Sequence, residues 1–334
     1  MNEMIFEAKD LSRSFAVGSS PLQDFTDHFL RNRQPAVLRA VDNVSMTLNE
    51  GETLGIVGES GCGKSTLARM IAGILPASSG ERRFRGEDYD SFLRRKRDAL
   101  KVQMVFQDPM SSLNPRLRVG EIIGEAAVLH GLVPRSRVKD YVVDILARVG
   151  LPADSVGRYP HQFSGGQRQR VGIARALAVK PDMLICDEAV AALDVSVQAQ
   201  IINLLLDIRR DSGLAMIFIS HDLGVIRHLC DRVAVMYLGR VVELAKTSEL
   251  FASPTHPYTR MLLDGMPKIS AQRRRFMPIQ GEIPSPLNPP SGCHFHPRCP
   301  MVTDHCHRVR PELREIEPGH VHACLNVEPH SKRL

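Results

Sequence analysis

The stretch GESGCGKSTLARMIAG, Gly58–Gly73, decides the fold of this chain. It follows the apolar run Thr53–Val57, whose β-branched residues predict a buried strand, and it continues into Ser65–Leu75, where apolar residues recur at helical spacing. Between strand and helix, Gly58–Ser65 matches the pattern GxxxxGK[ST], in which backbone N–H groups surround phosphate oxygens and glycine permits close approach. The order strand, glycine loop and helix predicts a phosphate-binding loop.

Two side chains of the loop have defined chemical uses. Lys64 supplies positive charge to the β and γ phosphates of a nucleotide, and Ser65 offers a hydroxyl to Mg²⁺. The N-terminus of the following helix adds the positive end of its dipole. The alternative interpretation is a tight strand-to-helix turn with a surface lysine, but the flanking strand and helix favour the phosphate site.

A second element of the same site is the run MLICDE, Met183–Glu188. Two acids at the end of a buried strand need a cation or hydrogen-bond donors, because an unpaired carboxylate is costly to bury. Asp187 is the candidate Mg²⁺ ligand, and Glu188 is the candidate base that polarises the attacking water. Taken alone, the pair could be solvated carboxylates at a strand end; together with the glycine loop it favours magnesium.

The composition excludes several classes of protein. The 334 residues, 43% of them hydrophobic, suffice for one large domain and an appendage. The 43 Lys and Arg residues only slightly exceed the 37 Asp and Glu residues, so no nucleic-acid partner is expected. No apolar run reaches the about 18 residues of a membrane span, and the N-terminus lacks a signal peptide's apolar core. We expect a cytosolic chain, unless a partner holds it at a membrane.

A third motif, FSGGQ at Phe163–Gln167, precedes a run with an apolar face at helical spacing that ends before Pro181. At this point the chain resembles the ATP-binding cassette (ABC) family of ATPases, whose LSGGQ signature is a phosphate clamp at a helix N-terminus. In that family the signature acts across a dimer interface on the partner's nucleotide. The resemblance implies an α/β P-loop NTPase fold, with a RecA-like core, an antiparallel β-subdomain and a helical subdomain, that works as half of a pair.

Four further residues occur in the order of the family. Gln107 follows an apolar strand and matches the loop glutamine that touches Mg²⁺ and water, and Asp194 matches the loop that links the two sites of a dimer. His221 follows another strand and matches the switch histidine on the γ-phosphate, while Phe15 matches the aromatic residue that stacks on adenine. Each could instead be an ordinary loop, strand-end or core residue; their shared order favours the family roles.

The resemblance therefore implies a complete set of site residues. The expected catalytic residues are Glu188, His221 and Gln107, and the expected Mg²⁺ ligands are Ser65, Gln107 and Asp187. The expected ATP-binding residues are Phe15, Gly58, Glu59, Ser60, Gly61, Cys62, Gly63, Lys64, Ser65, Thr66, Ser164, Gly165, Gly166, Gln167 and Asp194.

The chain departs from the family at two positions near the expected base. Ala189 stands where proline is usual, and Ala191 stands where serine is usual. These changes relax one backbone angle and remove one hydroxyl, which leaves open a binding module with an inactive ATP site. Because Glu188 remains, we expect an active ATPase.

The expected organisation is a cassette over 1–252, with a helical subdomain at about 109–165, and an extension over 253–334 with a four-cysteine cluster. Phe106–Ile123 and Ser253–Leu263 resemble the ATPases of peptide and nickel importers. In that family the helical insert binds a short helix of the membrane subunit, although its apolar residues could be core alone. Asp231–Leu244 predicts a hairpin, and the five prolines of Pro278–Pro290 predict an extended tail.

Seven cysteines without a secretion signal argue against a disulfide framework. Four of them, Cys293, Cys299, Cys306 and Cys324, gather in the proline-rich extension, where a metal would staple a segment that lacks an apolar core. The resemblance favours a [4Fe–4S] cluster; structural Zn²⁺ with neighbouring histidines, or free thiols, are the alternatives. The other cysteines, Cys62, Cys186 and Cys230, are expected to be small buried residues.

The function that the resemblance implies is ATP hydrolysis that powers a bacterial importer of dipeptides, oligopeptides or related solutes such as nickel, with MgATP at a dimer interface. Its implied partners are a second ATPase subunit, identical or paralogous, two transmembrane permease subunits and a solute-binding protein. The implied location is the cytoplasmic face of the inner membrane. The rival from another class is an ABC ATPase acting on DNA or the ribosome, which would carry a long coiled coil or a second cassette.

Overall fold

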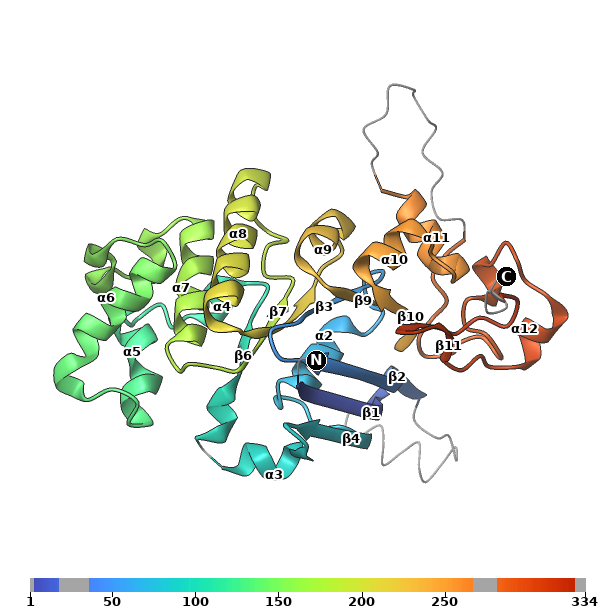
Figure 1. The fold of residues 1–334 in the computed structure, drawn as a ribbon, viewed down its shortest axis with the longest axis horizontal. Helices are drawn as coiled ribbons and strands as arrows, with labels where there is room; N and C mark the ends of the chain where they lie inside the picture. The colour runs from blue at the N-terminus through green and yellow to red at the C-terminus, as the bar shows by residue number, and fades with distance from the viewer. Residues whose placement is uncertain (1–2, 18–35, 96, 267–280, 328–334) are drawn as a thin grey trace, which may run out of the picture.

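The computed structural model describes residues 3–17, 36–95, 97–266 and 281–327 (Figure 1). Within these ranges the strands form a central sheet of order β11-β12-β10-β9-β3-β8-β7-β6 and a smaller sheet of order β2-β1-β4-β5. The central strands are β3 (Thr53–Val57), β6 (Val102–Val105), β7 (Met183–Asp187), β8 (Ala215–Ile219), β9 (Arg232–Tyr237), β10 (Arg240–Lys246), β11 (Arg314–Glu317) and β12 (His320–His322). The smaller sheet contains β1 (Met4–Val17), β2 (Ala36–Asn49), β4 (Ser79–Phe84) and β5 (Glu87–Asp88).

The middle of the central sheet is parallel. Strand β3 pairs in parallel with β8 and β9, and β7 pairs in parallel with β8 and β6. Every residue of β3, β7 and β8 is buried, as expected for parallel strands that are covered on both faces. Their carboxyl ends therefore lie along one edge, and the loops that follow them come together there.

Helices cover the two faces of this sheet with different partners. Alternate residues of a strand point to opposite faces, and Ile185 of β7 packs in one apolar cluster with Leu67 and Ile71 of α2 (Lys64–Ile71) and with β1 and β2. Its neighbour Leu184 belongs to the other cluster, with Val171 of α7 (Gly165–Leu177). Helix α2 thus lies between the two sheets, and α7 lies on the opposite face of the central one.

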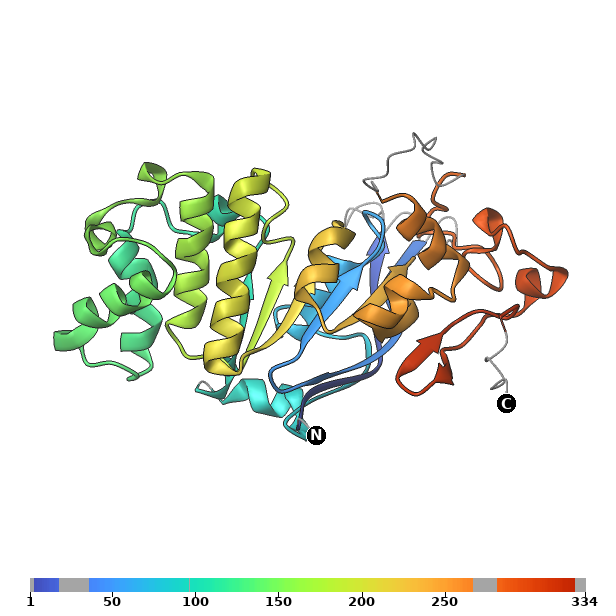
Figure 2. The ribbon, with the colours of Figure 1, turned by 45° about the horizontal axis from the view of Figure 1, so that its top comes forward.

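The remaining helices form two groups at opposite ends of the molecule (Figure 2). One group packs with α7 and contains α4 (Pro109–Ser112), α5 (Val119–Leu129), η2 (Arg135–Arg137), α6 (Val138–Arg148), η3 (Ala153–Gly157) and η4 (Pro160–Gln162). The short helix η1 (Asp98–Lys101) lies outside this group and contacts β6. The other group includes α10 (Thr247–Ala252), α11 (Pro257–Asp264), η5 (His296–Arg298) and α12 (Asp304–Arg308). Helices α3 (Tyr89–Arg94), α8 (Val195–Ser212) and α9 (Leu223–Leu229) complete the described fold.

Most of the predicted elements are present with small changes. The predicted hairpin is formed by β9 and β10 and turns at Leu238 and Gly239, which both have positive φ, 42° and 80°. The predicted helix Ser65–Leu75 is shorter, because the left-handed Gly73 (φ 74°) ends it and the N–H of Ile74 bonds back to the Arg69 carbonyl. Ile74, which follows this end, is 55% exposed.

The extension joins the central sheet through β12, which pairs antiparallel with β10. Residues 281–290, the described part of the predicted extended tail Pro278–Pro290, contain no helix or strand, as predicted. The segment Ala16–Ala36, whose composition predicts a polar insert, lies mostly outside the described residues. Among the residues that are described, every helix is too short or too polar to cross a bilayer.

A buried polar cluster fastens the extension to β10. The fully buried Glu243 accepts hydrogen bonds from the N–H and hydroxyl of Thr255, at 2.8 and 2.7 Å, and from the N–H of His256 at 3.0 Å. His320 Nε2 lies 2.8 Å from the same carboxylate. Burial alone would raise the pKa of Glu243, but the bonds from His320 and Thr255 outweigh it and lower that pKa to about 2. The carboxylate is therefore charged, and these bonds satisfy it.

Candidate functional site

The phosphate loop is held in shape by its own lysine. Lys64 Nζ donates to the carbonyl oxygens of Gly58 at 2.7 Å and Glu59 at 3.0 Å, and the Lys64 side chain is buried. The ammonium group therefore already lies within the turn of the loop. A phosphate that entered the loop would meet a cation whose position is fixed by two backbone contacts.

Two glycines of the loop are required by packing as well as by phosphate approach. A Cβ on Gly63 (φ 104°) would lie 2.1 Å from the carbonyl oxygen of Ala40 in β2. A Cβ on Gly58 (φ 155°) would lie 2.2 Å from the carbonyl oxygen of Met236 in β9. The loop is thus pressed against the backbone of both sheets, and any side chain at these positions would displace it.

Two of the three expected magnesium ligands, Ser65 and Asp187, are in contact, whereas the third, Gln107, bonds to Glu188. Ser65, at the start of α2, donates its hydroxyl to Asp187 Oδ1 at 3.0 Å, at the end of β7. Asp187 is only 5% exposed, and burial raises its pKa; the Ser65 hydrogen bond offsets part of this increase, and the charge of Glu188 adds to it. A cation beside these oxygens would relieve the cost of burying the carboxylate. A hydroxyl and a carboxylate are oxygen donors of the kind that Mg²⁺ prefers.

The three expected catalytic residues meet at one carboxylate. Gln107 Nε2 donates to Glu188 Oε2 at 2.8 Å, and His221 Nδ1 lies 3.7 Å from Glu188 Oε1. They follow β6, β7 and β8, which are neighbours in the sheet, so their convergence results from the parallel topology. Glu188 has a left-handed backbone (φ 47°) and its N–H bonds to the Ile219 carbonyl. Such a conformation is costly for a residue other than glycine and is common at functional sites.

The signature motif forms a separate helix N-terminus. Ser164 caps α7: its Oγ accepts from the Gln167 N–H at 3.3 Å, while Gln167 Oε1 accepts from the Ser164 N–H at 3.0 Å. A Cβ on Gly166 would lie 2.2 Å from Val197, so this motif packs against the segment that begins with Asp194. Because α7 and α2 lie on opposite faces of the central sheet, the signature does not complete the phosphate loop of its own chain.

The comparisons with known proteins show which family the chain belongs to. The ABC transporter family matches residues 41–191, and the family described as the oligopeptide/dipeptide transporter, C-terminal region, matches residues 242–306. The probable peptide ABC transporter ATP-binding protein of Sinorhizobium fredii is 52% identical over 291 residues, which cover 86% of this chain and 82% of that protein. The chain belongs to the ABC transporter ATPase family.

Further similarities cover the whole cassette. The oligopeptide transport ATP-binding protein OppF of Salmonella typhimurium is 49% identical over 304 residues, which cover 88% of this chain and 90% of that protein. A dimeric structure of the ATP-binding cassette MJ0796 in a post-hydrolysis state with ADP and Pi has a TM-score of 0.62 at 25% identity. It covers 73% of this chain and 99% of that chain. The predicted ABC fold and ATPase class are confirmed.

Phe15, the residue expected to stack on adenine, lies near the end of β1 opposite Leu38 of β2. Its ring is half-buried, and the guanidinium carbon of Arg13 lies 4.8 Å from the ring centroid. The ring is therefore not part of the fully buried core, and one of its faces has a cationic neighbour. This placement suits a surface ring in an ABC cassette that could accept a base.

The cysteines of the ABC ATPase fall into the two predicted groups. Cys62, Cys186 and Cys230 are buried within the apolar core, as predicted. In the extension, burial raises the pKa of the Cys293 thiol to about 11, and the charges of Cys306, Cys299 and Cys324 act in the same direction. These four thiols therefore lie close enough to influence one another. However, the structure, over its described ranges, places no three His, Cys, Asp or Glu side chains so that they could bind one metal ion.

Two of the neighbouring histidines are engaged elsewhere. His322 Nδ1 lies 2.9 Å from the Thr255 hydroxyl, and His296 Nδ1 lies 2.9 Å from the Cys293 carbonyl oxygen. A zinc site built from these rings would have to break those contacts.

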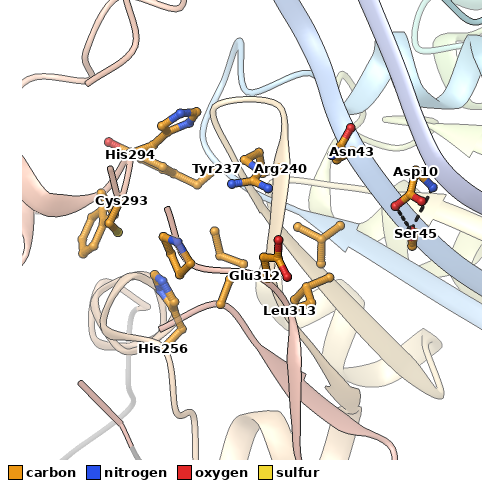
Figure 3. A pocket seen from close by; sticks show the side chains of 15 residues that line it. Asp10, Asn43, Ser45, Tyr237, Arg240, His256, Cys293, His294, Glu312 and Leu313 are labelled. Atoms are coloured by element: carbon orange, nitrogen blue, oxygen red, sulfur yellow. Dashed lines mark hydrogen bonds between the residues drawn. The ribbon is translucent and has the colours of Figure 1, made fainter. Parts of the chain in front are cut away.

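A cavity of about 470 Å³ lies where the small sheet, the β9–β10 hairpin and the extension meet (Figure 3). Asp10 and Ser45 line it from the small sheet, and they are hydrogen bonded to each other. Tyr237, His256 and Cys293 line it from the other side. The cavity is therefore distinct from the space in front of the phosphate loop.

One contact of the site was missed by reasoning from the sequence. Glu59, which was expected only as a member of the loop, forms an ion pair with Arg298 of the extension. The sequence offers two signals of this contact. One is a charged residue at a position of the glycine loop that the motif leaves unspecified, and the other is an arginine in a cysteine-rich segment. Neither signal identifies the other residue as its partner.

Proposed function

We propose that this ABC ATPase powers a bacterial importer of dipeptides or oligopeptides. The main support is that Gln107, Glu188 and His221 converge beside the phosphate loop. In addition, relatives of the chain are named as peptide transport proteins. The proposed units are a cassette over 1–252, with its helical subdomain at about 109–165, and an extension over 253–334. An importer of nickel or another solute is the alternative, because the solute would meet other subunits.

The arrangement of these residues supports a division of roles. Lys64 would exchange its backbone carbonyls for the β and γ phosphates of ATP, and Ser65 and Asp187 would hold Mg²⁺, which when bound neutralises phosphate charge. Glu188 would accept a hydrogen bond from the attacking water and polarise it. Gln107 would fix the orientation of that carboxylate, and His221, which is 62% exposed, would reach the γ-phosphate.

The second half of each site would come from another ATPase subunit, identical or paralogous. Ser164, Gly165, Gly166 and Gln167 form a capped helix N-terminus, which is a suitable seat for an anion. This seat lies on the face of the sheet opposite α2, so two chains are required to enclose one triphosphate. The alternative is that this chain has a weakly active half-site, because Ala189 and Ala191 replace residues usual in the family. A paralogous pair would accommodate such a half-site.

A groove in the helical region is the proposed contact with the permease. It has a volume of about 790 Å³ and lies between α5 and α6, with Leu129 76% exposed at its edge. Its floor includes Val138 and Val142, and its rim carries charges such as Glu125 and Lys139. An apolar floor with a charged rim suits a short amphipathic helix. Two permease subunits, each offering one such helix, would hold the pair at the cytoplasmic face of the inner membrane, where a solute-binding protein would deliver the solute.

We further propose that the four extension cysteines hold a [4Fe–4S] cluster, with Zn²⁺ as the alternative. Thiol donors alone suit an iron–sulfur cluster, and two nearby histidines, His296 and His322, already have other partners. Anaerobic purification of the full chain followed by iron and zinc analysis tests this. About four iron atoms per chain support the cluster, about one zinc atom supports the alternative, and neither metal would remove both.

The importer function is tested by reconstitution in liposomes. The chain is assembled with two permeases and a second ATPase subunit from the same organism, together with a solute-binding protein. We expect ATP hydrolysis that rises when the binding protein is loaded with peptide, and no rise with the unloaded binding protein. Stimulation by a nickel chelate instead of peptide would select the alternative solute. Hydrolysis that is independent of the permeases would contradict the importer function.

A further inference from the structure

The extension makes a two-point contact with the phosphate loop. Arg298 Nη1 donates to Glu59 Oε2 at 2.7 Å, and Nη2 donates to Glu59 Oε1 at 2.9 Å. The Arg298 side chain is 3% exposed and the Glu59 side chain is 20% exposed. Two parallel hydrogen bonds between a guanidinium and a carboxylate fix orientation as well as distance. The contact therefore restrains how Glu59 sits in the loop.

The backbone of the same loop residue is also held. The Glu59 N–H donates to the hydroxyl oxygen of Tyr258 in α11 at 3.0 Å, and Tyr258 is fully buried. The Glu59 carbonyl accepts from Lys64 Nζ at 3.0 Å. Residues after the cassette thus hold the N–H and carboxylate of Glu59, while the phosphate-binding lysine holds its carbonyl. A shift of Glu59 would move a backbone oxygen that positions the lysine.

Arg298 lies beside a cluster of three buried aromatic side chains. Phe295 packs against Tyr237 and Tyr258, with ring centroids 5.3 and 5.4 Å apart, and the two tyrosine rings are 4.7 Å apart. All three rings are at most 1% exposed. Tyr237 and Phe295 also border the cavity of Figure 3. Tyr237 comes from β9, whereas Tyr258 and Phe295 come from the extension. The orientation of Arg298 therefore depends on the docking of the extension.

The ion pair also has an electrostatic consequence for an anionic ligand. A free carboxylate in a phosphate loop would repel a triphosphate. Arg298 neutralises Glu59, and the hydrogen bond to Glu59 raises the pKa of Arg298, which keeps the guanidinium charged. Loss of Arg298 would leave a largely buried, unpaired negative charge beside the phosphate site.

We propose that Arg298 is a positioning residue of the nucleotide site: through Glu59 it holds the phosphate loop ready for MgATP, so that the extension sets nucleotide affinity. The inference rests on the proposed nucleotide site at Gly58–Ser65. Arg298 lies between Cys293 and Cys299 in the chain. The folded state of the cysteine segment therefore determines whether the loop receives this contact.

The test measures MgATP dissociation constants and steady-state hydrolysis of the full-length chain with its partner ATPase. The variants are Arg298→Met, Glu59→Gln, their combination and Arg298→Lys, and the exposed Arg308→Gln of the same extension is the control. We expect each neutralising variant to raise the dissociation constant and KM about tenfold, with kcat changed less than about twofold. The double variant should be no weaker than the weaker single variant, because the two changes remove one contact. Arg298→Lys should recover part of the loss.

Several outcomes would overturn the proposal. A lower melting temperature of Arg298→Met with an unchanged dissociation constant, measured below the melting transition, would show a role in stability alone. Additive losses in the double variant would show that the two residues act separately. If Arg298→Met does not fold, Glu59→Gln removes the same contact from the loop side and must still weaken binding. If the unmodified chain and Arg308→Gln bind no MgATP, the nucleotide site itself is wrong, and this inference falls with it.

Discussion

The phosphate-loop core and the C-terminal extension are stabilised by different balances of apolar and charged contacts. In the core, β3, β7 and β8 are buried at every position, and their side chains belong to large apolar clusters. The extension also buries the rings of Tyr258 and Phe295 against Tyr237, but it docks in addition through a charged cluster around Glu243, the Arg298–Glu59 pair and a short antiparallel pairing of β12 with β10. Apolar burial scales with area and tolerates small changes, whereas a buried charge is costly once its partner is lost. The extension should therefore be the part that responds to pH and to single polar substitutions.

The largest expected effect lies in the core and concerns chemistry rather than folding. Glu188→Gln keeps the shape of the side chain but removes the charge that Gln107 and His221 face. We expect ATP turnover to fall by about 10² to 10⁴, the range for loss of a general base, while MgATP affinity is retained. Steady-state hydrolysis beside equilibrium binding measures both. The control Glu81→Gln alters an exposed glutamate of β4 and should leave turnover unchanged. Undiminished turnover in Glu188→Gln would remove this residue from the mechanism.

The next effect tests how tightly the core packs around the loop. In Gly63→Ala the new methyl would lie 2.1 Å from the Ala40 carbonyl oxygen, at a residue with φ 104°. We expect a loss of at least about tenfold in MgATP affinity and a loss of stability of about 2 kcal/mol or more. Gly172→Ala is the matched control, because its Cβ would meet nothing within 4 Å in the middle of α7. That variant should be neutral or stabilised by up to about 1 kcal/mol. Equal behaviour of the two variants would contradict the packing argument.

The same contrast explains what could be predicted from the sequence. Strands β3 and β7 were predicted within a residue of their bounds because buried parallel strands read as short apolar runs. The meeting of Gln107, Glu188 and His221 followed from their place after such strands. The Arg298–Glu59 pair spans 239 residues and belongs to no repeating pattern, so nothing local announces it. The pairing of β12 with β10 was missed for the same reason, since β12 is only three residues long.

A substitution in the extension should sharpen the comparison. Glu243→Gln keeps the volume of a fully buried side chain but removes the charge that faces His320 and the Thr255 hydroxyl. We expect the extension to lose about 1–3 kcal/mol while the core strands keep their protection. Hydrogen exchange followed by mass spectrometry separates the two regions. Glu249→Gln, which changes a partly exposed residue paired with Lys246, should leave both unchanged. Uniform loss of protection over the whole chain would show that the two regions unfold as one unit.

The smallest expected effect is a pH dependence confined to the extension. Burial lowers the pKa of His256 and of His322 to about 4, below the about 6.5 of a histidine in an unfolded chain. Between these values the unfolded state binds protons that the folded state does not, so stability is complete above about pH 6.5 and falls as the pH drops towards 4. Glu243, whose pKa is lowered to about 2, adds a further loss of stability as the pH falls below about 4.5.

Hydrogen exchange in the extension at pH 7.5, 6.5 and 5.5, corrected for the intrinsic rate, measures this dependence. His256→Asn is the discriminating variant, because His256 caps α11 by accepting from the Tyr258 N–H, and asparagine caps helices as well without titrating. We expect this variant to have a flatter pH profile than the unmodified chain, by about 1.4 kcal/mol per pH unit at most. Exchange in β3 and β7 should not follow the same profile, since the titrating histidines contact the extension rather than the core. If exchange in β3 and β7 rose with acid as much as exchange in the extension, the buried titrating groups of the extension would not be the cause of its acid sensitivity.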